Sequence, residues 1–183
     1  MRYDPDRHHR RSLRLKHYDY STPGAYFVTI CTQDRECLFG DVVGTEMNLN
    51  EAGRMIDRWW KELPRKFSAL TLDEFVVMPN HLHGLLVLGA PVSGEPREPL
   101  GEIADWFKTM TTNEYIRGVK ALGWRGFPGR LWQRGYFDHV VRDTEDLERI
   151  REYIINNPAR WAEDAENPAA AGRQTVAEDP LFP

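Results

Sequence analysis

Two histidines one residue apart, His81 and His83, are the side chains in this chain best placed to do chemistry. On a β-strand, residues i and i+2 point to the same face, because side chains alternate with period two. Apolar runs at 75–78 and 85–88 predict that the strand is buried in a sheet. Two imidazoles held in this way can bind a divalent cation. The alternative is a pair of core histidines bonded to backbone groups.

A tyrosine and an asparagine near the end of the chain fall on one predicted helix, 143–158. Asp143 or Thr144 is the candidate N-cap, acidic residues fill the first turn, and a proline ends the helix. At about 100° per residue, Tyr153 and Asn157 lie one turn apart on one flank of the apolar stripe. Singly, each is typical of a packing or helix-end residue. Together with the histidine pair, they suggest a metal site beside a nucleophile.

The chain contains, in order, five sequence blocks at 11–20, 24–32, 76–83, 131–139 and 153–158. Together these blocks resemble one family of DNA enzymes. They are similar to the single-tyrosine transposases of the HUH (His-hydrophobic-His) endonuclease superfamily. More narrowly, they resemble the REP-associated tyrosine transposases, which act on repetitive extragenic palindromes. The resemblance spans about residues 10–161.

The resemblance implies an activity and a role for each candidate residue. Tyr153 would be the nucleophile, and His81, His83 and Asn157 would hold Mg²⁺ or Mn²⁺, although related transposases often carry glutamine in place of the asparagine. The enzyme would nick single-stranded or hairpin DNA and transfer the strand through a 5′-phosphotyrosine intermediate. Because the intermediate conserves the phosphodiester energy, strands can be rejoined without ATP.

Other interpretations remain open at this point. The chain could be a binding module that grips folded DNA or RNA without cutting it. A metal-dependent hydrolase of small molecules is disfavoured, because no carboxylate adjoins the histidine pair in the sequence. Tyr136 is a second candidate nucleophile, but it lies at a strand entrance without a helical partner. His139 is a candidate substitute ligand, and a packed strand histidine is the alternative.

The order of predicted elements indicates the fold. A strand, a helix, two strands, a helix and a strand give the β-α-β-β-α-β order of a ferredoxin-like α+β sandwich. Its antiparallel sheet would carry helices on one face, with the Tyr153 helix added at the C-terminus, and the resemblance implies the same fold. A polar turn region with room for a short strand follows the first strand. The predicted elements are 25–33, 50–66, 70–78, 81–88, 100–122 and 136–142.

The length of 183 residues fits one domain, which we place at 21–161. Residues 1–20 are predicted to form a basic arm, and residues 162–183 an acidic, disordered tail. The net charge of −4 is unusual for a nucleic-acid enzyme. The charges are segregated, however, with +4 over residues 1–16 and −4 from residue 162 onward.

No run of about 18 apolar residues is present, so we expect no membrane contact and a cytoplasmic, nucleoid-associated protein. It could be a monomer or a homodimer. Arginines interleaved with aromatic residues at 123–135 suit phosphate contacts and base stacking, and the N-terminal arm could grip the DNA backbone. The alternatives are a solvated loop with its tryptophan in the core, and a passive terminus. The candidate DNA-binding residues are Arg10, Arg11, Arg14, Lys16, Arg125, Arg130, Trp132 and Arg134.

Overall fold

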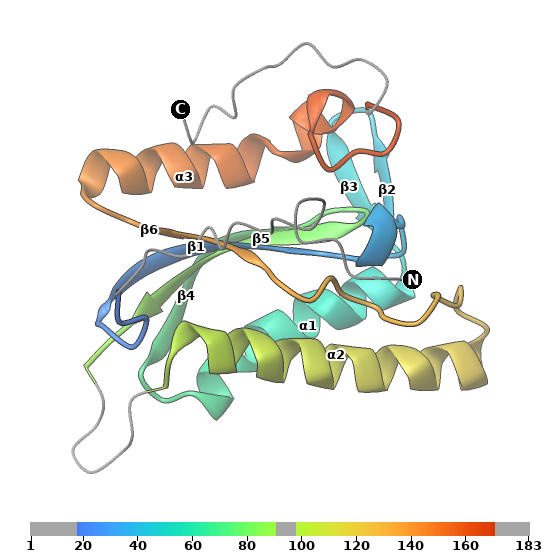
Figure 1. Cartoon of the computed structure of the whole chain (residues 1–183). Coiled ribbons are helices and arrows are strands. Elements are labelled where there is room, and N and C mark those ends of the chain that lie inside the picture. The colour runs from blue at the N-terminus through green and yellow to red at the C-terminus, as the bar shows by residue number, and fades with distance from the viewer. Residues whose placement is uncertain (1–17, 91–97, 171–183) are drawn as a thin grey trace, which may run out of the picture.

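The structure, a computed structural model, describes residues 18–90 and 98–170. Its centre is a four-stranded antiparallel sheet with the order β4-β5-β1-β6, and a separate two-stranded hairpin is formed by β2 and β3 (Figure 1). The strands are β1 (Gly24–Cys31), β2 (Gly40–Val43), β3 (Glu46–Leu49), β4 (Leu70–Val77), β5 (His81–Leu88) and β6 (Phe137–Val140). The helices are α1 (Glu51–Lys66), α2 (Leu100–Leu122) and α3 (Thr144–Asn156), with short 3₁₀ helices η1 (Gln33–Arg35) and η2 (Pro158–Glu163).

The predicted ferredoxin-like sandwich is confirmed. Apart from the β2–β3 hairpin, the chain runs β1-α1-β4-β5-α2-β6. Helices α1 and α2 cover one face of the sheet, while α3 covers the opposite face (Figure 1). The β2–β3 hairpin occupies the segment where the sequence indicated only turns and room for a short strand. The β4–β5 connection is three residues long, which makes these strands antiparallel neighbours as predicted.

Successive side chains of the two central strands, β1 and β5, point to opposite faces of the sheet. They therefore pack into two separate hydrophobic cores. On β1, Val28 packs with the core beneath α1 and α2, while Phe27 packs with Ile150 and Ile154 of α3. On β5, a side chain at Gly84 would collide with Trp60 of α1, since a Cβ there would lie 2.2 Å from the indole ring. The glycine therefore lets α1 press directly against the strand that carries both histidines. The histidines themselves point to the α3 face.

Helix α3 is capped and then tied to both edge strands of the sheet. The side chain of Asp143 accepts a hydrogen bond from the backbone N–H of Asp146, which satisfies one free donor of the first turn. Asp146 in turn lies 2.7 Å from Nε2 of His139 on β6. Two residues before Tyr153, Arg151 makes a two-point ion pair with Asp73 on β4. These contacts hold α3 at a fixed position over the sheet.

The prediction of a disordered tail from residue 162 is wrong for residues 162–170. Pro158 opens η2, and the segment after it folds back toward β5, where the amide of Asn80 donates to the carbonyl of Glu166 at 2.7 Å. The structure does not describe residues 1–17, so most of the predicted basic arm lies outside the described part of the chain. Among the helices that are described, none combines the length and the apolarity needed to cross a membrane.

Candidate active site

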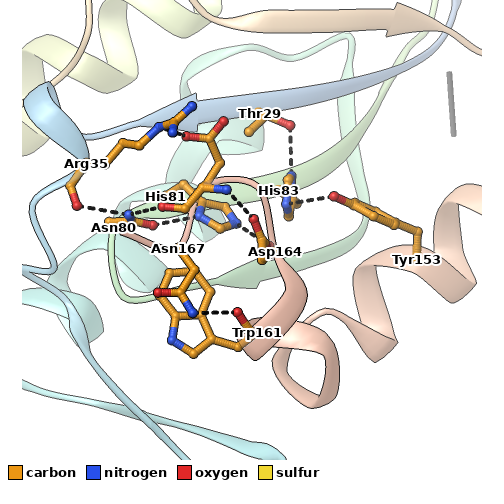
Figure 2. Close-up of polar contacts among 10 residues, drawn as sticks. Thr29, Arg35, Asn80, His81, His83, Tyr153, Trp161, Asp164 and Asn167 are labelled. Carbon is orange, nitrogen blue, oxygen red and sulfur yellow. Dashed lines mark hydrogen bonds and ion pairs between the residues drawn. The ribbon is translucent and has the colours of Figure 1, made fainter. Parts of the chain in front are cut away.

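The two histidines lie side by side on β5 and face α3, as the period of the strand predicted. Their ring centroids are 4.4 Å apart, and His81 is 0 % and His83 3 % exposed (Figure 2). They lie at the N-terminal end of β5, opposite Cys31 and Thr29 of β1 in the sheet register. This end of the strand lies next to the segment that follows α3, so the histidines meet residues from the C-terminal part of the domain (Figure 2).

A side-chain oxygen of a neighbouring residue lies within hydrogen-bonding distance of Nδ1 of each imidazole. Thr29 is paired with His83 across the β1–β5 ladder, and its Oγ1 lies 2.8 Å from Nδ1 of that histidine. The amide oxygen of Asn80 lies 2.8 Å from Nδ1 of His81. An Nδ1–H donating to each oxygen leaves the lone pair of Nε2 available on both rings. This is the tautomer that a metal ligand requires, and such orienting partners are the usual companions of metal-binding histidines.

Tyr153 and Asn157 of the α3 segment are brought to the same site. The hydroxyl of Tyr153 lies 3.5 Å from Nε2 of His83, and the two rings meet edge to face. Asn157 is the C-cap residue of α3 and is 2 % exposed. Burial lowers the pKa of His81, and the side chain of Asn157 is close enough to that imidazole to oppose part of the shift. The four residues expected to form the site therefore converge.

Three buried polar atoms at this site have no hydrogen-bond partner among the described residues: Nε2 of His81, Oδ1 of Asn157 and Oδ2 of Asp164. Buried polar atoms are rarely left unsatisfied, because burial without a partner is costly. All three are lone-pair donors, and the ligand atoms of His81, His83 and Asp164 lie within 4.8 Å of one another. A divalent cation fits this donor set of imidazole nitrogens, amide oxygen and carboxylate oxygen.

Asp164 is the residue that sequence reasoning missed. It follows η2, in the segment predicted to be a disordered tail, and its Oδ2 lies 3.8 Å from Nε2 of His81. The only signals in the sequence were an aromatic residue, Trp161, and the turn-forming pair Asn167-Pro168 within an otherwise polar stretch. A carboxylate does adjoin the histidines in space, so the sequence argument against a small-molecule hydrolase loses its premise.

Burial sets the charge state of the site. It lowers the pKa of His81, and the neighbouring carboxylates of Asp164 and Glu166 only partly oppose the shift. Burial, together with the adjacent His81, lowers the pKa of His83 well below its ordinary value. Both imidazoles are therefore neutral, as ligands must be. Burial also raises the pKa of the Cys31 thiol, which keeps this nearby group protonated and unreactive.

The other two candidates for chemistry are placed elsewhere. His139 is held by Asp146, so it ties β6 to α3 and is not a substitute ligand of the His81–His83 site. Tyr136 packs against the core on the α1–α2 side of the sheet, whereas Tyr153 packs with the α3-side core. The ammonium of Lys108 lies 5.5 Å from the ring centroid of Tyr136. Position in the fold therefore favours Tyr153 as the nucleophile.

The predicted DNA-binding residues in the loop at 123–135 differ in exposure. Trp132 is 4 % exposed, and its indole N–H donates to Thr111 in the core, so we correct the expectation that it stacks on a base. Arg130 and Arg134 are exposed and line an open pocket of about 400 Å³. Arg125 is exposed and 3.5 Å from a carboxylate oxygen of Glu36. The candidate arm residues Arg10, Arg11, Arg14 and Lys16 lie outside the described residues.

Comparisons with known proteins identify the family of the chain. The family model described as "Transposase IS200 like" matches residues 25–157. An uncharacterised protein of Haemophilus influenzae is 38 % identical over 89 % of this chain and 96 % of its own length. A second H. influenzae protein, provisionally named a REP-associated tyrosine transposase, is 24 % identical over 78 % of this chain and 74 % of its own.

Among solved structures, a REP-associated tyrosine transposase bound to a REP hairpin superposes with a TM-score of 0.55 and 19 % identity. The match covers 80 % of this chain and 73 % of the other. At this identity, the likeness supports the fold. The family model extends from β1 to Asn157, the last of the four residues that the sequence predicted for the site. The chain belongs to the family of IS200-like transposases.

Proposed function

We propose that this protein is a metal-dependent endonuclease and strand transferase that acts on single-stranded flanks of hairpin DNA. Membership of a transposase family supports a role in DNA transposition. The solved relative that shares the fold is bound to a REP hairpin, and a palindromic hairpin is accordingly the substrate class we propose here. The observation that carries the proposal is the position of the Tyr153 hydroxyl, 3.5 Å from Nε2 of His83.

Tyr153 is the proposed nucleophile. Its oxygen attacks a phosphorus of the DNA backbone, the bond from that phosphorus to the 3′ oxygen breaks, and a 5′-phosphotyrosine forms. The phenol loses its proton, and the departing 3′ oxygen takes one up as a hydroxyl. Because α3 is anchored to both edges of the sheet through Asp146 and Arg151, the helix can hold the phenol in an in-line geometry.

His81, His83 and Asn157 are the proposed ligands of Mg²⁺ or Mn²⁺. When bound, the cation would neutralise charge on the scissile phosphate and orient it. A role for His83 as a general base is less suitable, because burial holds its pKa well below the ordinary value. The amide oxygen of Asn80 can only accept and so favours the His81 tautomer that presents Nε2, and the hydroxyl of Thr29 can accept from Nδ1 of His83 in the same way.

A labelled hairpin oligonucleotide with a single-stranded flank tests the proposal. Incubation with the full chain and Mn²⁺ should give a covalent protein–DNA adduct that survives denaturing electrophoresis, together with a free 3′-hydroxyl fragment. Tight hairpin binding without any adduct, over a range of flank sequences and metals, would instead identify a binding module that does not cleave.

A further inference from the structure

We propose that Asp164 is a direct ligand of the same cation, supplied by the segment that follows α3. The inference rests on the metal use proposed above and adds an acidic ligand to a set otherwise made of neutral donors. The carboxylate comes from a part of the chain, 161–167, whose composition gave no indication of a site. Figure 2 shows Asp164 directed toward His81.

The environment of the carboxylate carries the argument. Oδ2 of Asp164 lies 3.8 Å from Nε2 of His81, and the side chain is 6 % exposed. Neither of these two atoms has a hydrogen-bond partner in the described part of the chain. Two lone pairs that face each other at this distance attract only if a positive charge lies between or beside them. A buried carboxylate without a counterion is strongly disfavoured, so a cation is the missing element.

The basic side chain that contacts this segment, Arg35, pairs with a different acid. Nε of Arg35 lies 2.8 Å from a carboxylate oxygen of Glu166, two residues beyond Asp164. Within residues 18–90 and 98–170, no lysine or arginine makes an ion pair with Asp164 itself. Glu166 is thus paired with Arg35, whereas Asp164 faces the histidines. A structural role in an ordinary surface ion pair does not account for Asp164.

The segment is held so that Asp164 cannot simply turn away. Its second oxygen, Oδ1, accepts from the backbone N–H of Glu166 at 2.6 Å. The amide nitrogen of Asn80 donates to the carbonyls of Glu166 at 2.7 Å and Arg35 at 3.0 Å, while its amide oxygen faces Nδ1 of His81 at 2.8 Å. One amide therefore positions both the histidine and the acidic segment. Such shared support is typical of groups that act on one ion.

A carboxylate ligand has a clear chemical consequence. Mg²⁺ and Mn²⁺ are hard cations that prefer oxygen donors, and a site with carboxylate and amide oxygens suits them better than a pair of imidazoles alone. The negative charge would strengthen metal binding before DNA arrives. It would also lower the net positive charge offered to the phosphate, so Asp164 tunes affinity for the metal against affinity for the substrate.

Titration of the DNA-free full chain with Mn²⁺ tests the inference, with calorimetry as the readout. Asp164→Asn removes the charge and keeps the shape, and we expect at least about a tenfold loss of Mn²⁺ affinity, since even an orienting partner outside the ligand set contributes this much. Glu163→Gln removes the same charge from an exposed neighbouring residue and should leave affinity unchanged. Metal-free Asp164→Asn should melt no lower than the parent, because an unpaired buried charge is gone. Added Mn²⁺ should raise the melting temperature of Asp164→Asn less than it raises that of the parent.

The outcomes separate this inference from the function on which it rests. If His81→Ala loses Mn²⁺ binding while Asp164→Asn binds as the parent does, only the role of Asp164 is overturned. If His81→Ala binds Mn²⁺ normally, the metal site itself is wrong. Should Asp164→Asn fail to fold, the anomalous signal of Mn²⁺ in crystals of the parent protein decides the question. A peak within ligand distance of both His81 Nε2 and Asp164 supports the inference, and a peak at the histidines alone overturns it.

Discussion

The hydroxyl of Tyr153 lies 3.5 Å from Nε2 of His83, the one ring nitrogen that Thr29 leaves available. The proposed nucleophile thus contacts the same atom that we assign to the metal. His83 would hold the cation through this nitrogen, and Tyr153 would then lie next to the metal site. The contact therefore places the proposed nucleophile and a proposed metal ligand side by side, on α3 and β5.

Replacement of Tyr153 by phenylalanine should abolish cleavage while preserving the fold. The variant loses one oxygen, which lies 3.5 Å from Nε2 of His83, and keeps the ring, so we expect a loss of about 1 kcal/mol or less in the free energy of unfolding. The aromatic packing against Phe27 is kept. Urea denaturation measures the first effect, and adduct formation on the labelled hairpin measures the second. Hairpin affinity should stay near that of the parent.

Tyr136→Phe is the matched control, because it makes the same chemical change on the other side of the sheet. This variant should retain substantial cleavage. Peptide mapping of the trapped adduct should place the phosphotyrosine on Tyr153. A phosphotyrosine on Tyr136, or an adduct that persists in Tyr153→Phe, would contradict the assignment.

Removal of the metal should stop the reaction without unfolding the protein. A chelator should abolish adduct formation, and added Mn²⁺ or Mg²⁺ should restore it. His81→Ala should remain inactive at any metal concentration, with a circular dichroism spectrum like that of the parent. Full cleavage in metal-free buffer would rule out a metal role. The histidine variant also separates metal use from DNA binding, since its hairpin affinity should change less than its activity.

Local signals were sufficient to predict the elements that build the site. The strand alternation around His81 and His83 placed both imidazoles on one buried face. Helix periodicity placed Tyr153 and Asn157 on one flank of α3, where both reach that face. The sequence offered Asp143 and Thr144 as N-caps of α3, and the structure shows that Asp143 is the cap. These features depend on short-range geometry, which the residue types encode directly.

The remaining features depend on contacts between distant segments. Asp164 approaches His81 only because η2 reverses the chain and Asn80 binds the carbonyl of Glu166, 86 residues away. No local pattern distinguishes such a segment from a solvated acidic tail. Likewise, Trp132 belongs to an arginine-rich loop by composition, yet its ring packs against Phe39 and Phe107. Burial of one aromatic side chain overrides the polar character of its neighbours.

The exposed arginines of the loop should contribute to DNA affinity through phosphate contacts. Arg130 and Arg134 line the same pocket, and each that contacts a phosphate should lower the salt dependence of hairpin binding by about one unit when replaced by alanine. Arg65→Ala, in the last turn of α1 and outside the loop, is the control; α1 covers the face of the sheet opposite α3 (Figure 1). Fluorescence anisotropy at several salt concentrations gives the slopes. Equal slopes for all three variants and the parent would exclude the loop from the interface.

The basic N-terminal arm is expected to add a second set of DNA contacts, which do not depend on the DNA sequence. Residues 1–16 carry six lysines and arginines in an otherwise acidic chain. Deletion of these residues should weaken hairpin binding and lower its salt slope, because fewer counterions are released from the DNA. The rate of cleavage at saturating DNA should change little, since the deletion leaves the site intact. Unchanged affinity at every salt concentration would show that the arm is passive.

The ion pair between Arg151 and Asp73 should make the stability of the protein depend on pH. The hydrogen bonds from Arg151 lower the pKa of Asp73 below its ordinary value. A carboxyl group whose pKa is lower in the folded state stabilises the fold above its unfolded pKa of about 3.9, and the contribution is lost as the pH falls through the folded pKa. The parent should therefore be more stable than Asp73→Asn at pH 7, and the difference should shrink below about pH 4. Urea denaturation of both proteins across this pH range measures the difference in stability, from which the contributions of other carboxylates largely cancel.

Glu74→Gln is the control, because it removes the adjacent, exposed charge. Its difference in stability from the parent should not shrink in this way as the pH falls. A constant difference between the parent and Asp73→Asn down to the lowest pH would mean that the ion pair does not hold α3, and with it Tyr153, against the sheet.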